Sequence, residues 1–164
     1  MKMLVVGGSQ GIGKEIKSYY QAESISRTEN YTFPDNTKEI IDACSTYDII
    51  INCIHGSNQL NLSKTLFEAL ENKTIISIGS LSYIFEPENP KRELNDWNKE
   101  LIFNNSSVKH VIINLSWCFN CRDEAKLTKI KREDIFSAID FITKMHYSTS
   151  SIMQIDIKGK VLDV

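Results

Sequence analysis

The chain has 164 residues and a mass of 18.8 kDa, and this length predicts a single domain over residues 1–164. With 41% hydrophobic and 24% charged residues, the composition is that of a folded globular protein and excludes a disordered or fibrous chain. A net charge of −2 gives no general attraction to nucleic acid or to an anionic membrane surface, so neither is an expected partner.

Strand and helix patterns alternate through the first third of the chain. Met3–Gly7 is a short apolar β run, and Ile12–Tyr20 has the apolar spacing of a helix. Ser24–Arg27 predicts a short strand, and Tyr31–Pro34 is a candidate for another. A helical pattern follows, with Asp, Asn and Thr available as capping residues near its start.

The alternation continues to the C-terminus. Tyr47–Ile54 is a continuous apolar run, which is typical of a strand buried on both faces. Leu60–Leu70 then predicts a helix, and Thr74–Gly79 predicts a second buried strand. After a polar loop the patterns predict a helix, a strand, a helix and a last strand, over Arg92–Phe103, His110–Ser116, Arg132–Met145 and Ser151–Ile157.

Apolar strands that alternate with helices predict an α/β fold, in which a mostly parallel sheet of about six or seven strands is covered by helices on both faces. Ligands bind to such sheets at the carboxyl ends of the strands. The glycines after the first strand stand there, and the helix that follows offers free N–H groups to a phosphate. A Cβ in this turn would hold the phosphate away, so the pattern favours nucleotide binding over an ordinary turn.

The segment GGSQGIG over Gly7–Gly13 resembles the glycine motif of the short-chain dehydrogenase/reductase family, with Gly7, Gly11 and Gly13 as its key glycines. The resemblance implies a Rossmann fold, a nicotinamide dinucleotide cofactor and an oxidoreductase acting on a small carbonyl or alcohol. It also implies cofactor contacts from the intervening Ser9, Gln10 and Ile12. Three further landmarks follow in the family's order, namely Asp35 beside the adenine, Asn52 at the end of a strand, and Ser80 as the catalytic serine.

The end of the second strand selects between the two nicotinamide cofactors. NAD enzymes usually place a carboxylate there for the ribose 2′-hydroxyl, whereas a 2′-phosphate requires a cation. Ser26, Arg27 and Thr28 stand where NADP-dependent members of the family bind the phosphate, and the planar fork of an arginine suits it. The sequence therefore predicts NADP(H). The alternative is that Arg27 is a solvated surface residue, and the nearby Glu29 weakens the case for NADP(H).

The catalytic centre departs from the family pattern. The family uses a Tyr as acid and base with a Lys four residues later, and no Tyr of this chain has a Lys at that spacing. Lys99 is the counterpart of the family lysine, where it would hold the nicotinamide ribose, but Asn95 stands four residues before it. Asn61 resembles the asparagine that holds a relay water. The proton would come from Tyr83, His55 or that water.

Two functions therefore stay open. Ser80 and Lys99 favour an NADP(H)-dependent oxidoreductase, and the missing Tyr–Lys pair favours a non-catalytic NADP(H)-binding or sensing protein.

Four cysteines without a secretory signal predict reduced thiols in a cytoplasmic protein. Cys118 and Cys121 form one Cys-x-x-Cys pair, and zinc would require two more ligands, so no metal is expected.

The assembly of the chain is a separate expectation. A short chain with a small core favours association, which predicts a homodimer or a homotetramer. The apolar residues Leu94, Trp97 and Leu101 are candidates for the contact, because the family pairs through the helices that flank this part of the sheet.

Overall fold

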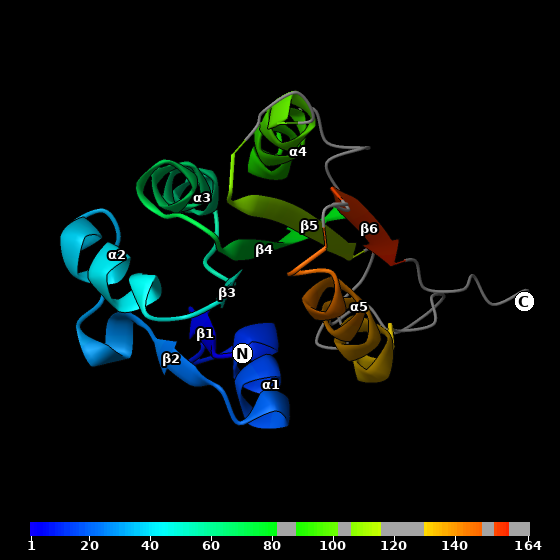
Figure 1. Ribbon diagram of the computed structural model, residues 1–164, viewed down its shortest axis with the longest axis horizontal. Helices are drawn as coiled ribbons and strands as arrows, with labels where there is room; N and C mark the ends of the chain where they lie inside the picture. The colour runs from blue at the N-terminus through cyan, green and yellow to red at the C-terminus, as the bar shows by residue number, and fades with distance from the viewer. Residues whose placement is uncertain (82–87, 102–105, 116–129, 149–152, 158–164) are drawn as a thin grey trace, which may run out of the picture.

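The computed structural model describes residues 1–81, 88–101, 106–115, 130–148 and 153–157. Within them, one sheet of six strands is parallel throughout (Figure 1). The strands are β1 (Met3–Val6), β2 (Glu23–Ile25), β3 (Ile49–Asn52), β4 (Thr74–Ser80), β5 (Lys109–Leu115) and β6 (Gln154–Ile157). Their order across the sheet is β2-β1-β3-β4-β5-β6.

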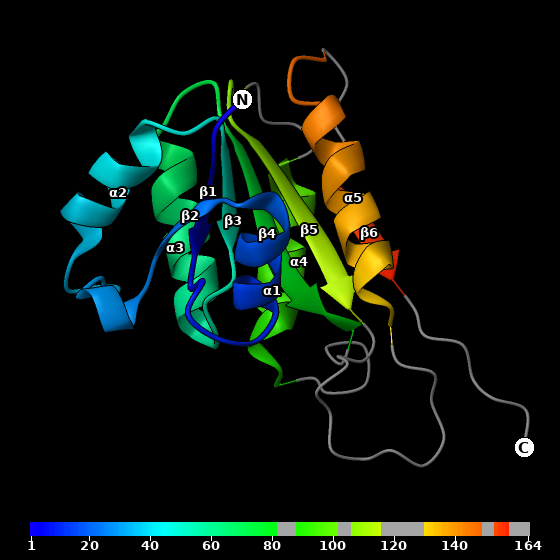
Figure 2. The same cartoon turned by 90° about the horizontal axis from the view of Figure 1, so that it is seen from below.

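The helices that connect the strands lie on both faces of the sheet. They are α1 (Gly11–Tyr20), α2 (Thr37–Ser45), α3 (Ser57–Ala69), α4 (Pro90–Glu100) and α5 (Arg132–Lys144). The first and last of them cover one face, and the other three cover the opposite face (Figure 1). Figure 2 shows that the strands run in one direction and that the loops after β1 and β4 leave from the same edge. The predicted doubly wound Rossmann-type fold is confirmed. In the described part of the chain, no helix is long and apolar enough to span a membrane.

Coverage of both faces explains why the central strands are apolar at almost every position. Successive strand residues point to opposite faces. Val5 and Ile51 accordingly pack in the cluster under α1 and α5, and Leu4 and Ile50 pack in the cluster under α2 and α3. A strand with one face in solvent alternates apolar and polar residues. The central strands do not show this alternation, as expected for a parallel sheet between two helical layers.

The expected strand at Tyr31–Pro34 does not form, and that prediction is wrong. After β2 the chain enters a 3-10 helix over Arg27–Glu29, and Asn30 then takes a left-handed conformation with a φ of 64°. The amide of Tyr31 donates back to the carbonyl of Ser26 at 3.0 Å, so the chain turns instead of running on as a strand. In the part of the chain that the structure describes, β2 is the edge strand on this side and the sheet has six strands, the lower of the two numbers predicted.

A layer of buried polar side chains lies between the sheet and the helices α3 and α4. Each member is at most 2% exposed, and together they are Asn52, Gln59, Ser63, Ser77, Asn95, Asn98, His110 and Asn114. Burial of so many polar groups is tolerable only when hydrogen bonds replace the water that they lose. These residues bond to one another and to backbone carbonyls, so the layer fixes α3 and α4 against the sheet.

One hydrogen-bonded chain through this layer determines the state of His110. Asn52 Nδ2 donates to Ser63 Oγ at 3.0 Å, and Ser63 Oγ lies 2.9 Å from Ser77 Oγ. Ser77 Oγ lies 2.9 Å from Nε2 of His110, whose Nδ1 lies 2.6 Å from Oδ1 of Asn98. The amide oxygen of Asn98 can only accept, so Nδ1 carries a hydrogen. Burial of the ring disfavours a second proton, so the imidazole is neutral and Nε2 accepts from Ser77.

We predict that buried, neutral His110 makes the protein less stable in acid. Burial lowers the pKa of His110 to about 3, below its ordinary value of 6.5. The unfolded chain binds this proton below about pH 6.5 and the folded chain does not, so acid favours unfolding. Above pH 6.5 the titration of His110 takes nothing from the free energy of unfolding. As the pH drops from 6.5 towards 3, the free energy of unfolding falls by about 1.4 kcal/mol per pH unit because of this residue. Urea unfolding between pH 7 and pH 4 measures this slope.

The variant His110→Gln provides the test, because it removes the titrating group and keeps a polar side chain. Its free energy of unfolding is expected to fall less steeply with acid than that of the unchanged protein. His146→Gln is the comparison, since His146 is partly exposed and should account for less of the slope. Equal slopes for His110→Gln and the unchanged protein would contradict the assignment.

Candidate functional site

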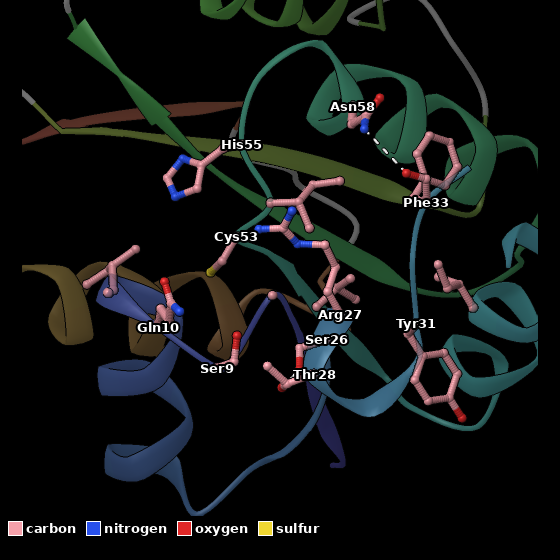
Figure 3. A pocket seen from close by; sticks show the side chains of 16 residues that line it. Ser9, Gln10, Ser26, Arg27, Thr28, Tyr31, Phe33, Cys53, His55 and Asn58 are labelled. Carbon is pink, nitrogen blue, oxygen red and sulfur yellow. Dashed lines mark hydrogen bonds between the residues drawn. The ribbon is translucent and has the colours of Figure 1, made fainter. Parts of the chain in front are cut away.

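A cavity of about 460 Å³ lies at the carboxyl ends of β1 and β3. The glycine turn after β1, the segment after β2 and the loop between β3 and α3 form its walls (Figure 3). The connection that leaves β1 runs through α1 on one face of the sheet, and the connection that leaves β3 runs through α3 on the other face. Neighbouring loops diverge at such a switch point, and ligands of doubly wound sheets bind in the resulting crevice.

Glycines keep the turn between β1 and α1 open and compact. Gly7 and Gly11 have φ angles of 89° and 53°, in the left-handed region that favours glycine. A Cβ on Gly13 would stand 2.4 Å from the carbonyl oxygen of Gly7, and a Cβ on Gly7 would stand 3.1 Å from the backbone of Cys53. Helix α1 therefore begins in direct contact with the end of β1, and β1 ends in direct contact with the end of β3.

The N-terminus of α1 faces this cavity. Its N-cap residue, Gln10, makes no capping bond with its side chain, and the first turn holds no acidic residue. The first N–H groups of a helix have no partner within the helix, and they lie at the positive end of its dipole. Gly11 and Ile12 of this turn line the cavity. The arrangement is suited to an anion such as a phosphate.

Eight of the predicted cofactor residues line the cavity, from two separate segments. They are Gly7, Ser9, Gln10, Gly11, Ile12, Ser26, Arg27 and Thr28. Gly13 is buried beneath them at the contact between α1 and β1. The fold therefore brings the glycine turn and the end of β2 to one site.

The other three predicted cofactor residues do not line the cavity. Asp35 is exposed in the turn before α2. Asn52 is fully buried, and its side chain belongs to the polar layer. Lys99 is exposed on α4 and forms an ion pair with Asp96 at 3.1 Å, so the structure does not bring it to this site.

A cation and a carboxylate both stand at the end of β2. The side chain of Arg27 extends into the cavity towards the loop after β3 (Figure 3). The hydroxyl of Ser26 lies 2.8 Å from that of Thr28 and donates to the carboxylate of Glu29 at 2.8 Å. Arg27 thus lines the cavity, while Glu29 is tied back to Ser26 and is not a lining residue.

Of the predicted catalytic residues other than Lys99, Ser80 and Asn61 belong to the described part of the chain. Ser80 is the last residue of β4 and stands three positions beyond Ser77, the partner of the last β3 residue. Ser80 therefore extends past the end of β3. Asn61 is exposed on α3. Tyr83 lies outside the described residues, as do Cys118 and Cys121.

Two titratable side chains line the cavity after β3. Burial lowers the pKa of His55, and the nearby charges of Lys91 and Arg27 lower it further. His55 is therefore neutral near pH 7 and can accept a hydrogen bond from a ligand. Burial raises the pKa of Cys53 to about 12, so its thiol stays protonated and is not a nucleophile. In the described segments, no three His, Cys, Asp or Glu residues gather to hold a metal ion.

An apolar and aromatic wall completes the cavity, and sequence reasoning did not identify it. Tyr31, Phe33, Ile40 and Ile54 line this part. Asn58 Nδ2 donates to the carbonyl of Phe33 at 3.3 Å and so ties α3 to the loop after β2 (Figure 3). In the sequence, Tyr31 and Phe33 favour a strand, and only the turn at Asn30 places them beside the ligand crevice. Such a wall suits a flat, aromatic part of a ligand.

The residues predicted for contact with a second copy are largely used within the chain. Leu94 is 1% exposed. The ring of Trp97 lies 5.8 Å from that of Phe67 and 4.8 Å from that of His110, measured between centroids. These side chains hold α4 against α3 and β5, Trp97 remains half-buried, and the homodimer or homotetramer stays a prediction.

Comparisons with known proteins support the fold. No protein-family model matches the sequence, and a search of curated proteins finds no match. Among solved structures, the chain is similar to the 3-alpha-hydroxysteroid dehydrogenase from Pseudomonas sp. complexed with NADH, at 12% identity over 95% of both chains and a TM-score of 0.60. A Rossmann-fold NAD(P)-binding family protein from Shigella flexneri has 17% identity over 97% of this chain and 94% of its own, with a TM-score of 0.58.

A third similar structure is an NAD-dependent NDP-hexosamine 5,6-dehydratase involved in tunicamycin biosynthesis. Its identity is 9%, over 98% of this chain and 77% of that chain, and the TM-score is 0.69. At these identities the likeness shows the shared Rossmann fold alone.

We predict that the contact between α1 and β1 tolerates no Cβ at Gly13. Gly13→Ala should destabilise the protein by about 1–3 kcal/mol, because the methyl group would overlap the carbonyl of Gly7 and force α1 away from β1. Gly11→Ala is the matched control. It meets no atom within 4 Å and should lose only about 1 kcal/mol, from its positive φ. Chemical unfolding of both variants measures the difference, and a Gly13→Ala variant as stable as the unchanged protein would contradict the contact.

Proposed function

We propose that the chain binds a nicotinamide dinucleotide in this cavity and that the cofactor is NADP(H). One observation carries the proposal. A single cavity joins the uncapped N-terminus of α1, an aromatic wall and the cation of Arg27. A dinucleotide phosphate has groups that match all three, namely a diphosphate, an adenine ring and a 2′-phosphate.

The residues present fit this cofactor. The amides of Gly11 and Ile12 would hold the diphosphate, in a cradle that the glycines leave unfilled. Tyr31 and Phe33 would flank the adenosine, and Arg27 would bind the 2′-phosphate. When bound, the cofactor supplies a hydride.

For the reaction, we propose reduction of a small carbonyl compound or oxidation of the corresponding alcohol. Ser80, past the end of β3, would donate a hydrogen bond to the reacting oxygen of the substrate. A site without the family's tyrosine loses an acid catalyst that typically contributes about 10²–10⁴-fold, so turnover should be slow. Lys99 is not carried into this proposal, because its exposed side chain pairs with Asp96.

The second candidate function is a non-catalytic NADP(H)-binding or sensing protein. It rests on the absence of any Tyr-x-x-x-Lys pair in the whole sequence. Both functions require the same cofactor site, and they differ in whether bound NADPH is consumed. Oxidation of NADPH, followed by its absorbance in the presence of a panel of small carbonyl compounds, separates them.

We predict tighter binding of NADPH than of NADH. A charge-assisted contact from Arg27 to the 2′-phosphate should contribute about 1.5–3 kcal/mol, which is about one to two decades of affinity. Arg27→Ala should remove most of this preference and leave NADH binding nearly unchanged. Titration of both cofactors, followed by tryptophan fluorescence, measures the affinities.

Lys14→Ala is the control for this comparison. Lys14 is an exposed cation close to the glycine turn and does not line the cavity. Its removal should preserve the preference for NADPH. Equal affinity of the unchanged protein for the two cofactors, or an unaltered preference in Arg27→Ala, would remove Arg27 from the site.

We predict a separate effect of Ser80 on turnover. If NADPH is oxidised with any carbonyl compound of the panel, Ser80→Ala should slow the reaction by about 10²-fold, the usual effect of losing one hydrogen bond to a developing oxyanion. NADPH affinity should stay within a few-fold. Ser45→Ala, at the exposed end of α2, is the matched control and should leave the rate unchanged. Undiminished turnover in Ser80→Ala would exclude this role.

A further inference from the structure

A second lysine of α4, Lys91, is partly buried, whereas the family spacing indicates Lys99. Lys91 stands in the first turn, at the i position of an i, i+3, i+4, i+7 set with the buried Leu94, Asn95 and Asn98. Its side chain is therefore on the inward stripe of the helix. Nζ donates to Oε1 of Gln59 and lies 3.4 Å from the carbonyl oxygen of Ile78 in β4.

Gln59 holds this lysine at the carboxyl ends of β3 and β4. Its Nε2 donates to the carbonyls of Asn52 and Ile78, each at 2.9 Å, and so bridges the last residue of β3 and a late residue of β4. With both amide hydrogens used in this way, the amide oxygen is left to accept from Lys91. The ammonium group is thus fixed beside the crevice in which the proposed cofactor lies.

No acidic group neutralises Lys91 within the described residues. From the loop after β3 it faces the protonated thiol of Cys53 and the neutral imidazole of His55. The neighbouring groups from α3 and β4 are the amide of Gln59 and the carbonyl of Ile78, which are also uncharged. No ion pair involves Lys91 in the described part of the chain.

Such a position is unfavourable for an ammonium ion that has no partner. Burial lowers the pKa of Lys91 to about 8. A buried charge is retained at low cost only when an opposite charge and hydrogen bonds replace its water. The described chain supplies the hydrogen bonds and not the opposite charge. A ligand anion would supply it.

The surroundings of Lys91 connect it to the ligand cavity. Its charge acts on Cys53 and on His55, and both of these residues line the cavity. Arg27 also acts on His55, from the end of β2. The charges of two cations therefore act on His55, that of Arg27 from the end proposed for the 2′-phosphate and that of Lys91 from beside Ile78 of β4.

We infer that Lys91 binds an oxyanion of the substrate, so that the small carbonyl or alcohol compound of the proposed function carries a carboxylate or a phosphate group. The inference rests on the proposed function for the identity of the reacting group. The cofactor's diphosphate is the other source of an oxyanion. We assign the substrate because the diphosphate already has the amides of α1, whereas Lys91 belongs to the β4 side of the crevice.

Nuclear magnetic resonance of the full chain with ¹³Cε-labelled lysine tests the assignment without requiring turnover. The Lys91 resonance is identified by its absence in Lys91→Met, or in Lys91→Arg if the first variant does not fold. Its titration is followed in the free protein, with NADP⁺, and with NADP⁺ plus pyruvate, inorganic phosphate or uncharged butanone. Exposed Lys38 of α2, identified in the same way with Lys38→Met, is the internal control.

We expect pyruvate or phosphate to raise the pKa of Lys91 by about one unit or more, because an opposite charge at close range favours the ammonium form. Butanone and NADP⁺ alone should not raise it, and Lys38 should titrate unchanged in every sample. If neither oxyanion shifts Lys91, the inference is wrong. If NADP⁺ alone produces the full shift, the lysine serves the cofactor and the substrate assignment is wrong.

A different measurement, the fluorescence titration with the cofactor, tests the proposed function. If NADP⁺ and NADPH leave the tryptophan fluorescence unchanged at all concentrations, the cofactor proposal is wrong. The pyruvate and phosphate samples, repeated without NADP⁺, then still report whether Lys91 binds an oxyanion.

Discussion

The close contact between α1 and the end of β1 is the constraint on which the site depends. Only a residue without a Cβ permits Gly13 to lie against the carbonyl of Gly7, and this contact fixes the first turn of α1 at the carboxyl edge of the sheet. Because β1 and β3 are neighbours, and because α1 and α3, which follow them, cover opposite faces, the loops after β1 and β3 diverge. The cavity is therefore a consequence of the winding of the chain, and side chains such as Arg27 and Phe33 line it.

The polar layer imposes a second constraint on the neighbouring strands. Where β3 stops at Asn52 and β4 continues, Gln59 bonds to the backbone carbonyls of Asn52 and Ile78. A leucine at this position would remove both hydrogen bonds, and loss of a partner by a buried carbonyl is costly. The amide oxygen of the same glutamine accepts from Lys91, so Gln59 both bridges β3 and β4 and positions this partly buried cation. One residue at the β3–β4 junction thus links the structure of the sheet to the lysine that we propose as an oxyanion ligand.

Sequence patterns predicted most of the fold, because the strands at Met3–Gly7, Tyr47–Ile54 and Thr74–Gly79 are continuously apolar and the helices between them have regular apolar spacing. Strand order also predicted that the glycine turn lies at the carboxyl edge of the sheet, whereas Arg27 was identified through the family resemblance at the end of the second strand, and both line the cavity. Tyr31–Pro34 was predicted wrongly, because aromatic and β-branched content outweighed the turn that begins at Asn30. Lys91 could not be predicted from the sequence, because the family spacing indicates Lys99. Which face of α4 is buried depends on the packing of the helix against the polar layer, and that packing is visible only in the structure.

The central claim is that a dinucleotide phosphate binds across the glycine turn and the end of β2, and amide chemical-shift mapping with NADP⁺ tests it most directly. In a ¹⁵N-labelled sample, the account predicts that the largest shifts on saturation fall on the amides of Gly11, Ile12 and Gly13 and on that of Arg27. The same titration with NAD⁺ should move the three glycine-turn amides and leave Arg27 less affected. Shifts confined to residues away from the cavity, or a spectrum unchanged at saturating NADP⁺, would contradict the account.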